Sequence, residues 1–370
     1  MKNTTPELTA PETTVHPALA QPFKWYGFRL GSIGIFLVAL FLLSLLTGKR
    51  MDPYFFQVMI SCGIYIILAV SLNLVNGITG QFSIGHAGFY AVGAYVGGSW
   101  TTLIQPRLVE KLPFLQFGTP VGDISNLLIA LALGGAAAGV AGLLVGLPSL
   151  RLRGDYLAIV TLGFGEVIRG VLLNMDVVGG PRGMSGIPTL VRSYNLGFFW
   201  VFLMAAIVIV VSRNLLKSVR GLTFLAVRED EIAADAMGVN TTKVKVTAFV
   251  IGSAFAGIAG VLYAHFFTGI SPDAFDMNTS IIITTMVVLG GTGSISGSLL
   301  AAILLTALPE VLRALKSVNF QDYRMVIFST ILIVLMLTRP QGIFGSKEFD
   351  LKMFARFMPG KKKLTEGGAS

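Results

Sequence analysis

Long apolar runs separated by short polar stretches make up most of the chain. A helix that crosses a bilayer needs about 20 mostly apolar residues, or fewer where the protein thins the bilayer. The runs at 87–104, 280–290 and 298–312 are short or glycine-interrupted, so half-helices or re-entrant segments also fit them. The pattern predicts an all-α polytopic membrane protein with about ten transmembrane helices, some short or broken. The predicted spans are 28–46, 54–75, 87–104, 127–147, 156–173, 198–211, 244–267, 280–290, 298–312 and 325–338.

Composition supports this class of fold. Hydrophobic residues make up 54% of the chain and charged residues 13%, whereas soluble proteins carry about 25% charged residues. The mean hydropathy is +0.75. These values argue against a soluble enzyme, a disulfide-rich secreted domain and a disordered chain. The single cysteine, Cys62, rules out an internal disulfide.

The distribution of charge predicts the domain organisation and the orientation. A polar N-terminal tail (1–27) precedes the membrane region (28–340), and a basic C-terminal tail (341–370) follows it. An even number of spans puts both termini on one side. Placing them in the cytoplasm puts most of the 28 basic residues there, as the positive-inside rule requires. The stretch 268–279 contains Asp273 and Asp276 but no basic residue, so we expect it outside.

A short glycine-rich motif occurs in each half of the chain. Residues 77–83 read GITGQFS and residues 290–296 read GGTGSIS, and each motif follows an apolar run. Glycine permits positive φ and breaks helices, and broken helices at corresponding positions of two halves are typical of transporters. An ordinary turn in water is the alternative interpretation. The candidate residues of a translocation path or helix break are Asn73, Gly77, Thr79, Gly80, Gln81, Ser83, Gly85, Thr284, Thr285, Gly291, Thr292 and Gly293.

The longest internal polar segment is 213–245. Acidic residues at 229–231 precede alanines, and Gly238 stands where a helix C-cap is expected. Asn240 or Thr241 can cap the next span. This order predicts a short helix over about 229–237 between two loops. A solvated connector is the alternative.

Other polar residues within the spans have structural explanations. Glu166 and Arg169 are spaced to pair on one helix face. His86 and His265 have no acids at ligand spacing, so we expect packing roles and no metal site. The absence of a G-x-x-x-x-G-K-[ST] motif indicates that nucleotide, if it is used, binds in another chain.

Glycine pairs spaced four residues apart predict close helix contacts. They occur at 93 and 97, at 135 and 139, and at 142 and 146. Small residues on one helix face let two backbones approach closely in the membrane.

Four segments together resemble one protein family. They are Gly77–Phe89 (GITGQFSIGHAGF), Gly154–Glu166 (GDYLAIVTLGFGE), Gly179–Ile187 (GGPRGMSGI) and Arg228–Gly238 (REDEIAADAMG). They resemble ABC-importer permeases of the LivM type, which belong to branched-chain amino acid importers. The resemblance implies a type II-like permease fold, transport of leucine, isoleucine and valine, and alternating access.

The resemblance also implies an assembly in a bacterial inner membrane. The expected partners are a second, LivH-type permease, two ATPase subunits that hold ATP and Mg, and a periplasmic substrate-binding protein. This chain would have no cofactor and no catalytic residue. The residues that match the family's ATPase-coupling segment are Arg228, Glu229, Asp230, Glu231, Ala233, Ala234 and Gly238. A permease for urea, short amides or other amino acids, or an autonomous secondary carrier, is the alternative.

Overall fold

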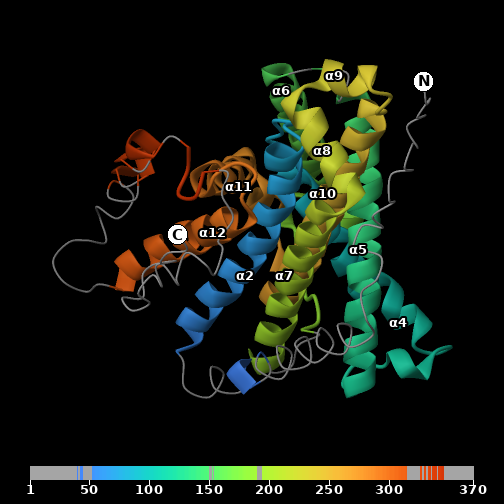
Figure 1. Cartoon of the computed structure of the whole chain (residues 1–370). Coiled ribbons are helices and arrows are strands. Elements are labelled where there is room, and N and C mark those ends of the chain that lie inside the picture. The colour runs from blue at the N-terminus through green and yellow to red at the C-terminus, as the bar shows by residue number, and fades with distance from the viewer. Residues whose placement is uncertain are drawn as a thin grey trace, which may run out of the picture.

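The computed structural model is built from helices, most of them grouped in one bundle (Figure 1). The structure describes residues 40, 42–44, 52–149, 152, 154–189, 194–314, 326, 329–330, 332–334, 336–339 and 341–345. The long helices are α2 (Pro53–Asn73), α5 (Pro120–Ser149), α6 (Asp155–Leu173), α7 (Tyr194–Lys217), α10 (Thr241–Phe267) and α12 (Ile295–Ala314). The shorter ones are α3 (His86–Ser99), α4 (Gln105–Leu108), α8 (Val219–Glu229), α9 (Glu231–Ala236) and α11 (Met277–Gly290).

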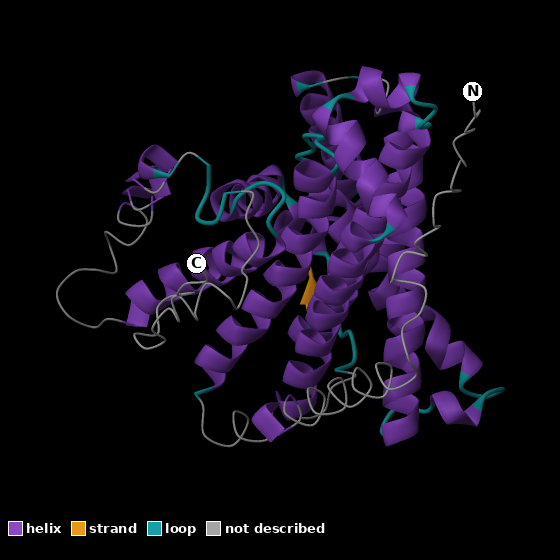
Figure 2. Ribbon diagram, in the orientation of Figure 1, coloured by secondary structure: helices purple, strands orange, loops and turns teal. Residues whose placement is uncertain are grey.

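Short irregular elements link these helices. A π-helical turn (Leu74–Ile78) ends α2, and a second one (Trp100–Ile104) joins α3 to α4. The 3₁₀ turns are Pro113–Leu115, Asp176–Val178, Gly180–Arg182 and Pro272–Phe275. Strands β1 (Met184–Ser185) and β2 (Gly269–Ile270) pair antiparallel, with Met184 opposite Ile270 and Ser185 opposite Gly269 (Figure 2).

Six helices in the described residues are long and apolar enough to cross a membrane: 53–78, 120–149, 155–173, 196–217, 241–267 and 295–313. They confirm six of the predicted spans. The predicted span 280–290 is α11, which has only 14 residues, and 87–104 is α3 with its π turn. The predicted spans 28–46 and 325–338 lie largely outside the described residues, so the total of ten stays a prediction.

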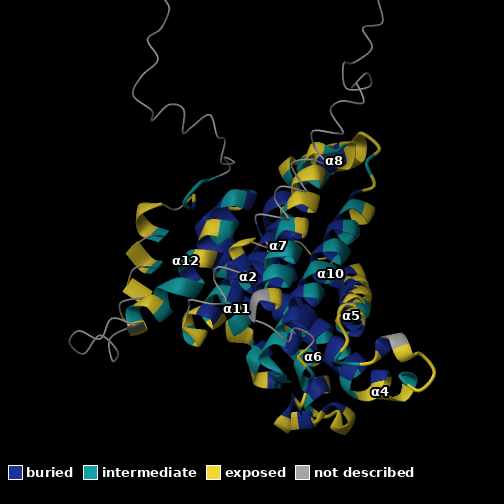
Figure 3. Cartoon of the chain, turned by 90° about the horizontal axis from the view of Figure 1, so that it is seen from below, coloured by how far each residue is buried: buried dark blue, intermediate teal, exposed yellow. Residues whose placement is uncertain are grey.

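The two ends of the bundle differ. Helices α8 and α9 lie at one end with the first residues of α6 and α10; we call this the α9 end (Figure 1). Helices α2, α5 and α7 run toward it, and α10 runs away from it. Viewed from below, α2 lies among buried residues whereas α5 exposes much of its length (Figure 3). In the most apolar window of each span, 78% of the residues are buried for 53–78, which contains α2, but only 22% for α6. Helix α2 therefore belongs to the core and α6 to the periphery.

Glycine allows α3, α5 and α10 to pack with their backbones almost touching. A Cβ at Gly93 of α3 would overlap the backbone of Gly257 on α10. A Cβ at Gly142 of α5 would overlap Ser253, and one at Gly260 would overlap the backbone oxygen of Tyr90. The predicted glycine pairs of α3 and α5 therefore do mark helix contacts. The glycines of α10 that face them are not four apart, so the spacing rule missed them.

The close contact predicts a large effect of one methyl group. Gly93→Ala should destabilise the protein by about 1–3 kcal/mol, because the neighbouring element is backbone and cannot rotate away. Gly163→Ala on α6 is the matched control: a Cβ there meets nothing within 4 Å, and alanine favours the helix by up to about 1 kcal/mol. Thermal unfolding in detergent measures both. Equal melting temperatures would contradict the close approach of α3 and α10.

Candidate functional site

The two glycine motifs, far apart in sequence, meet in the structure. The backbone N–H of Gly293 donates to Oδ1 of Asn73 over 2.8 Å, although the two residues are 220 positions apart. A Cβ at Gly77 would overlap the backbone of Gly293. The end of α2 and the start of α12 are thus in direct contact through their glycine motifs. We call this contact, formed by Asn73, Gly77 and Gly293, the break junction.

The first break begins where α2 loosens into its π turn. Gly80 then has φ +69°, a conformation that side chains disfavour. Two groups return to the carbonyl of Val75: the Gln81 N–H at 3.1 Å and the Thr79 hydroxyl at 2.8 Å. The chain therefore reverses while its freed backbone groups stay bonded within the protein.

The segment between the first break and α3 is held from two sides. The Asn76 side chain donates to the carbonyl of Ser83 at 2.9 Å and accepts the Ser83 N–H at 3.1 Å. The Thr161 hydroxyl of α6 accepts the N–H of Ile84 at 3.2 Å. Gly85 lies so close to α6 that a Cβ there would overlap the carbonyl of Thr161. Ser83 and Gly85 are thus buried positioning elements of the break.

The second break joins α11 to α12. Gly291 and Gly293 have φ +109° and +94°, and Thr292 between them is exposed. The N–H of Ile343 donates to the carbonyl of Leu289 at 2.8 Å. The described residues 341–345, predicted as the start of the C-terminal tail, therefore return to this break.

Arg228, near the end of α8, lies against both breaks. Its Nη1 donates to the carbonyl of Gly77 at 3.0 Å. A Cβ at Gly293 would stand 2.8 Å from the same nitrogen, and one at Gly80 would stand 3.2 Å from Cγ of Arg228. The candidate coupling segment and the candidate path segments, predicted separately, therefore share one contact through Arg228.

The predicted single helix over 229–237 is wrong in its boundaries. Arg228 and Glu229 complete α8, and α9 starts only at Glu231. Asp230 separates the two helices and caps the second, because its Oδ1 accepts the N–H groups of Ile232 at 2.8 Å and Ala233 at 3.0 Å. A short polar cap residue favours a helix start over continuation. Gly238 follows α9 with φ +83°, in keeping with its predicted cap position.

Glu231 is anchored to α10. Its carboxylate pairs with Nζ of Lys245 at 2.7 Å, and the exposed fractions of the two side chains are 28% and 10%. The Lys245 carbonyl in turn accepts from Nε2 of Gln81 at 3.4 Å. A polar cavity of about 200 Å³ lies between these groups. Its lining is Thr79, Gly80, Gln81, Phe82, Leu152, Gly154, Leu157, Val227, Arg228, Glu231 and Lys245.

Large apolar side chains on α8 and α9 are exposed at this polar end. Ile232 is 70% exposed and Met237, just after α9, is 84% exposed; Val219 and Leu222 of α8 are exposed as well. Ala233 is exposed and Ala234 is buried. The exposed residues of α9 are thus Ile232, two alanines and Asp235, whereas its first acid, Glu231, points back to Lys245.

Two predicted path residues lie apart from the junction contacts. The hydroxyls of Thr284 and Thr285 donate to carbonyls of their own helix, those of Ser280 and Ile281, at 2.9 and 2.8 Å. The Ser280 hydroxyl accepts the N–H of Ala87 at 3.1 Å, so α11 starts beside α3. The role of the two threonines in a path stays a prediction.

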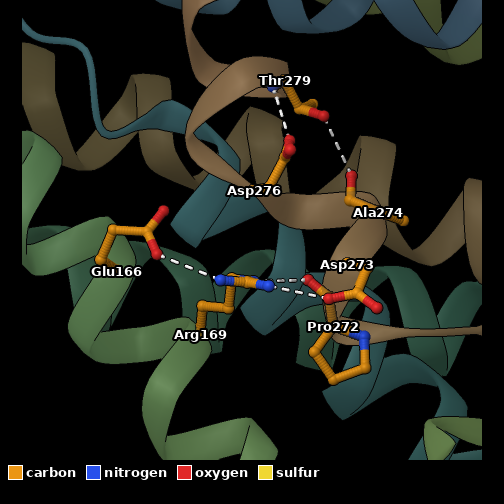
Figure 4. Close-up of polar contacts among 7 residues, drawn as sticks. All are labelled: Glu166, Arg169, Pro272, Asp273, Ala274, Asp276 and Thr279. Carbon is orange, nitrogen blue, oxygen red and sulfur yellow. Dashed lines mark hydrogen bonds and ion pairs between the residues drawn. The ribbon is translucent and has the colours of Figure 1, made fainter. Parts of the chain in front are cut away.

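The predicted pair of Glu166 and Arg169 is present, but Arg169 also has partners that the sequence did not indicate. The two side chains are 3.4 Å apart, while Arg169 makes a shorter contact of 2.7 Å to Asp273 and donates to the carbonyl of Pro272 at 3.2 Å (Figure 4). The segment after β2, expected as a plain external loop, is therefore held against α6. Asp276 caps α11 by accepting the Thr279 N–H at 2.8 Å.

The two histidines in the described part of the chain have structural partners. Nε2 of His86 lies 2.8 Å from the hydroxyl of Ser71, and Nε2 of His265 lies 3.2 Å from that of Thr101. Both rings are buried. Within the described part of the chain, no group of three His, Cys, Asp or Glu side chains could hold a metal ion.

Comparisons with known proteins agree on one family. A family model described as "Branched-chain amino acid transport system / permease component" matches residues 54–336. The chain is 38% identical to the LivM permease protein of the high-affinity branched-chain amino acid transport system of Salmonella typhimurium, over 78% of this chain and 70% of that protein. It is 35% identical to the Escherichia coli LivM protein, over 86% and 76%. It is also 28% identical to the Salmonella typhimurium LivH protein, over 77% and 92%. No solved structure matches the chain significantly.

The shared contacts of Arg169 predict a ranking of variants. Arg169→Leu should lower stability more than Glu166→Leu, because it leaves both Asp273 and the Pro272 carbonyl without their partner. We expect a difference on the order of 1 kcal/mol, since the groups are partly exposed. Thermal unfolding in detergent measures it. The double variant should stay as unstable as Arg169→Leu, and full recovery in it would show that Asp273 contributes nothing.

Proposed function

Because the chain belongs to the family of branched-chain amino acid transport permease components, we propose that it is a membrane subunit of an ATP-driven importer for leucine, isoleucine and valine. The observation that carries the mechanism is the contact of Arg228 with both helix breaks. A helix outside the bundle core thereby touches the ends of two long helices at one place. The chain has a transport role, and ATP hydrolysis takes place in separate subunits.

The mechanism is alternating access driven from the α9 end. An ATPase subunit that moves α9 would also move α10 through Glu231 and Lys245. It would move the end of α2 through the bond from Arg228 to the Gly77 carbonyl. Asn73 and Gly293 carry the same displacement to the start of α12. Glycine breaks let these helix ends rotate without straining side chains.

The partners of the proposed assembly are a LivH-type permease, two ATPase subunits that bind ATP and Mg, and a periplasmic binding protein. The relatives named LivM and LivH support a pair of related permeases. The exposed Ile232 and Met237 support a docked partner at the α9 end, because large apolar side chains at a polar surface gain free energy when covered. The ATPase would contact these side chains, and Glu231 would hold α9 in place.

We also propose the orientation in the membrane. The α9 end, which holds Arg213, Lys217, Arg220, Arg228, Lys243 and Lys245, faces the cytoplasm of a bacterium. Both termini lie on that side if the chain has ten spans in a type II-like permease fold. The end that holds α4 then faces the periplasm, where a binding protein delivers its substrate.

A charge swap tests the coupling contact. Glu231→Lys should reduce leucine uptake and substrate-stimulated ATP hydrolysis of the complete complex about tenfold or more, because it places two cations together at a partly buried site. Glu231→Lys with Lys245→Glu restores opposite charges and should recover most of both activities. Proteoliposomes containing the complex measure both readouts.

Glu110→Lys is the matched control, since Glu110 is exposed and lies at the end opposite α9. It should keep most of the uptake. If the complexes carrying each of these three variants all transported leucine at the normal rate, the coupling role of Glu231 would be refuted.

Accessibility of introduced cysteines tests the orientation. In a Cys62→Ala background, Lys111→Cys should react with an impermeant maleimide added to intact spheroplasts, because residue 111 follows α4 at the end opposite α9. Lys217→Cys should react only after the membrane is permeabilised. The reverse pattern would place the α9 end outside and remove the proposed ATPase contact.

A further inference from the structure

A second cavity lies away from the break junction, at the end opposite α9. Its volume is about 480 Å³, within the 300–1,000 Å³ typical of small-molecule sites. The walls come from the first half of α2, the end of α10, the middle of α11 and the second half of α12. The lining residues used below are Tyr54, Ser61, Phe267, Ile282, Met286, Leu305, Thr306, Glu310 and Arg313. We call it the α2–α12 cavity.

One wall of the cavity is apolar. Ile282 and Met286 lie one turn apart on α11, Leu305 comes from α12, and Phe267 closes the end of α10. Met286 is almost fully buried. Branched and flexible apolar side chains of this kind accommodate a small aliphatic group without fixing its shape tightly.

The other wall carries two opposite charges. Glu310 and Arg313 lie one turn apart on α12, with their closest nitrogen and oxygen 3.9 Å from each other. Tyr54 of α2 lies between them: its hydroxyl donates to the Glu310 carboxylate and accepts from Nη1 of Arg313 at 3.4 Å. The guanidinium also stands over the Tyr54 ring, 5.3 Å from its centre. The two charges are thus presented side by side, at the outer limit of ion-pair distance.

A buried polar atom in the same cavity has no partner. The Thr306 hydroxyl oxygen is buried and forms no hydrogen bond in the described structure. It lies one turn before Glu310 on α12. An unsatisfied buried hydroxyl is costly, and because this oxygen is shielded from the cavity, a ligand group could pair with it only after neighbouring side chains move.

We propose that the α2–α12 cavity is a transient binding site for the zwitterion of a free aliphatic amino acid. Glu310 binds the α-ammonium group and Arg313 binds the α-carboxylate. The aliphatic side chain lies against Phe267, Ile282, Met286 and Leu305. This inference rests on the proposed function and assigns a substrate-recognition site on the side where substrate arrives.

A protection experiment tests the site directly. Ser61→Cys is placed in the Cys62→Ala background, and the complete complex is reconstituted in nanodiscs without its binding protein. Millimolar leucine should slow maleimide modification of Cys at position 61 about tenfold when the site is near saturation. Isocaproate, which lacks the ammonium group, and isoamylamine, which lacks the carboxylate, should slow it less than about twofold at the same concentration.

Two charge variants separate recognition from structure. With Arg313→Gln, leucine should lose most of its advantage over isoamylamine, because the cation that selects a carboxylate is gone. With Glu310→Gln, leucine should lose most of its advantage over isocaproate, because the anion that selects an ammonium group is gone. Glu110→Gln and Lys111→Gln remove charges from the same end of the protein outside the cavity, where both residues are exposed, and should leave protection unchanged. A merely structural pair would alter the modification rate without changing this selectivity.

The outcomes separate this inference from the proposed function. The cavity assignment is overturned if the complex imports leucine with its binding protein but leucine gives no protection. It is also overturned if leucine, isocaproate and isoamylamine protect equally. A complex that imports none of the three branched-chain amino acids, while leucine still protects selectively, would refute the proposed function and keep the site.

Discussion

Broken helices inside a membrane protein must find hydrogen-bond partners for their freed backbone groups within the protein, because the hydrocarbon offers none. Each group left unpaired there would cost several kcal/mol. The break junction meets this constraint with side chains from other segments: Asn73 accepts the Gly293 N–H, and Arg228 donates to the Gly77 carbonyl. These two bonds join the end of α2, the end of α8 and the start of α12 at one place.

The same constraint makes the junction suitable for transmitting motion. A displacement of α8 cannot leave Gly77 behind without exposing its carbonyl, so the end of α2 has to follow. Asn73 Nδ2 and Gln81 Oε1 are buried beside the breaks and have no hydrogen-bond partner among the described residues. In a second arrangement of the helix ends, these two atoms could form the hydrogen bonds that they lack here. A transporter that alternates between two states requires such a second arrangement. Rigidity is provided elsewhere, by the glycine contacts of α3, α5 and α10, which permit no sliding without a steric clash.

Local signals in the sequence predicted the local structure well. The caps at Gly238 and Asn240, the glycine breaks and the pairing of Glu166 with Arg169 depend on residues close in sequence, and the structure contains all of them. The contacts of Arg228 and Lys245 span long sequence separations and leave no periodic trace, so no pattern could reveal them. The acids at 229–231 predict one helix that includes Asp230, because acids favour helix starts. Its competing role as a cap, which ends α8 and starts α9, follows from the backbone path that only the fold determines.

Helix α12 links the two sites of the proposed mechanism. Its first residues follow Gly293 in the break junction, and its second half carries Thr306, Glu310 and Arg313 in the α2–α12 cavity. Twenty residues of helix extend about 30 Å, so a small rotation at the glycine break becomes a larger displacement at the far end. Tyr54 on α2 is one contact that such a rotation would break, because it joins the two helices at the cavity. Movement of α12 away from α2 would then separate Tyr54 from the charges that hold the zwitterion. In this arrangement one helix connects the arrival of force at the α9 end with the freeing of substrate from its arrival site at the opposite end.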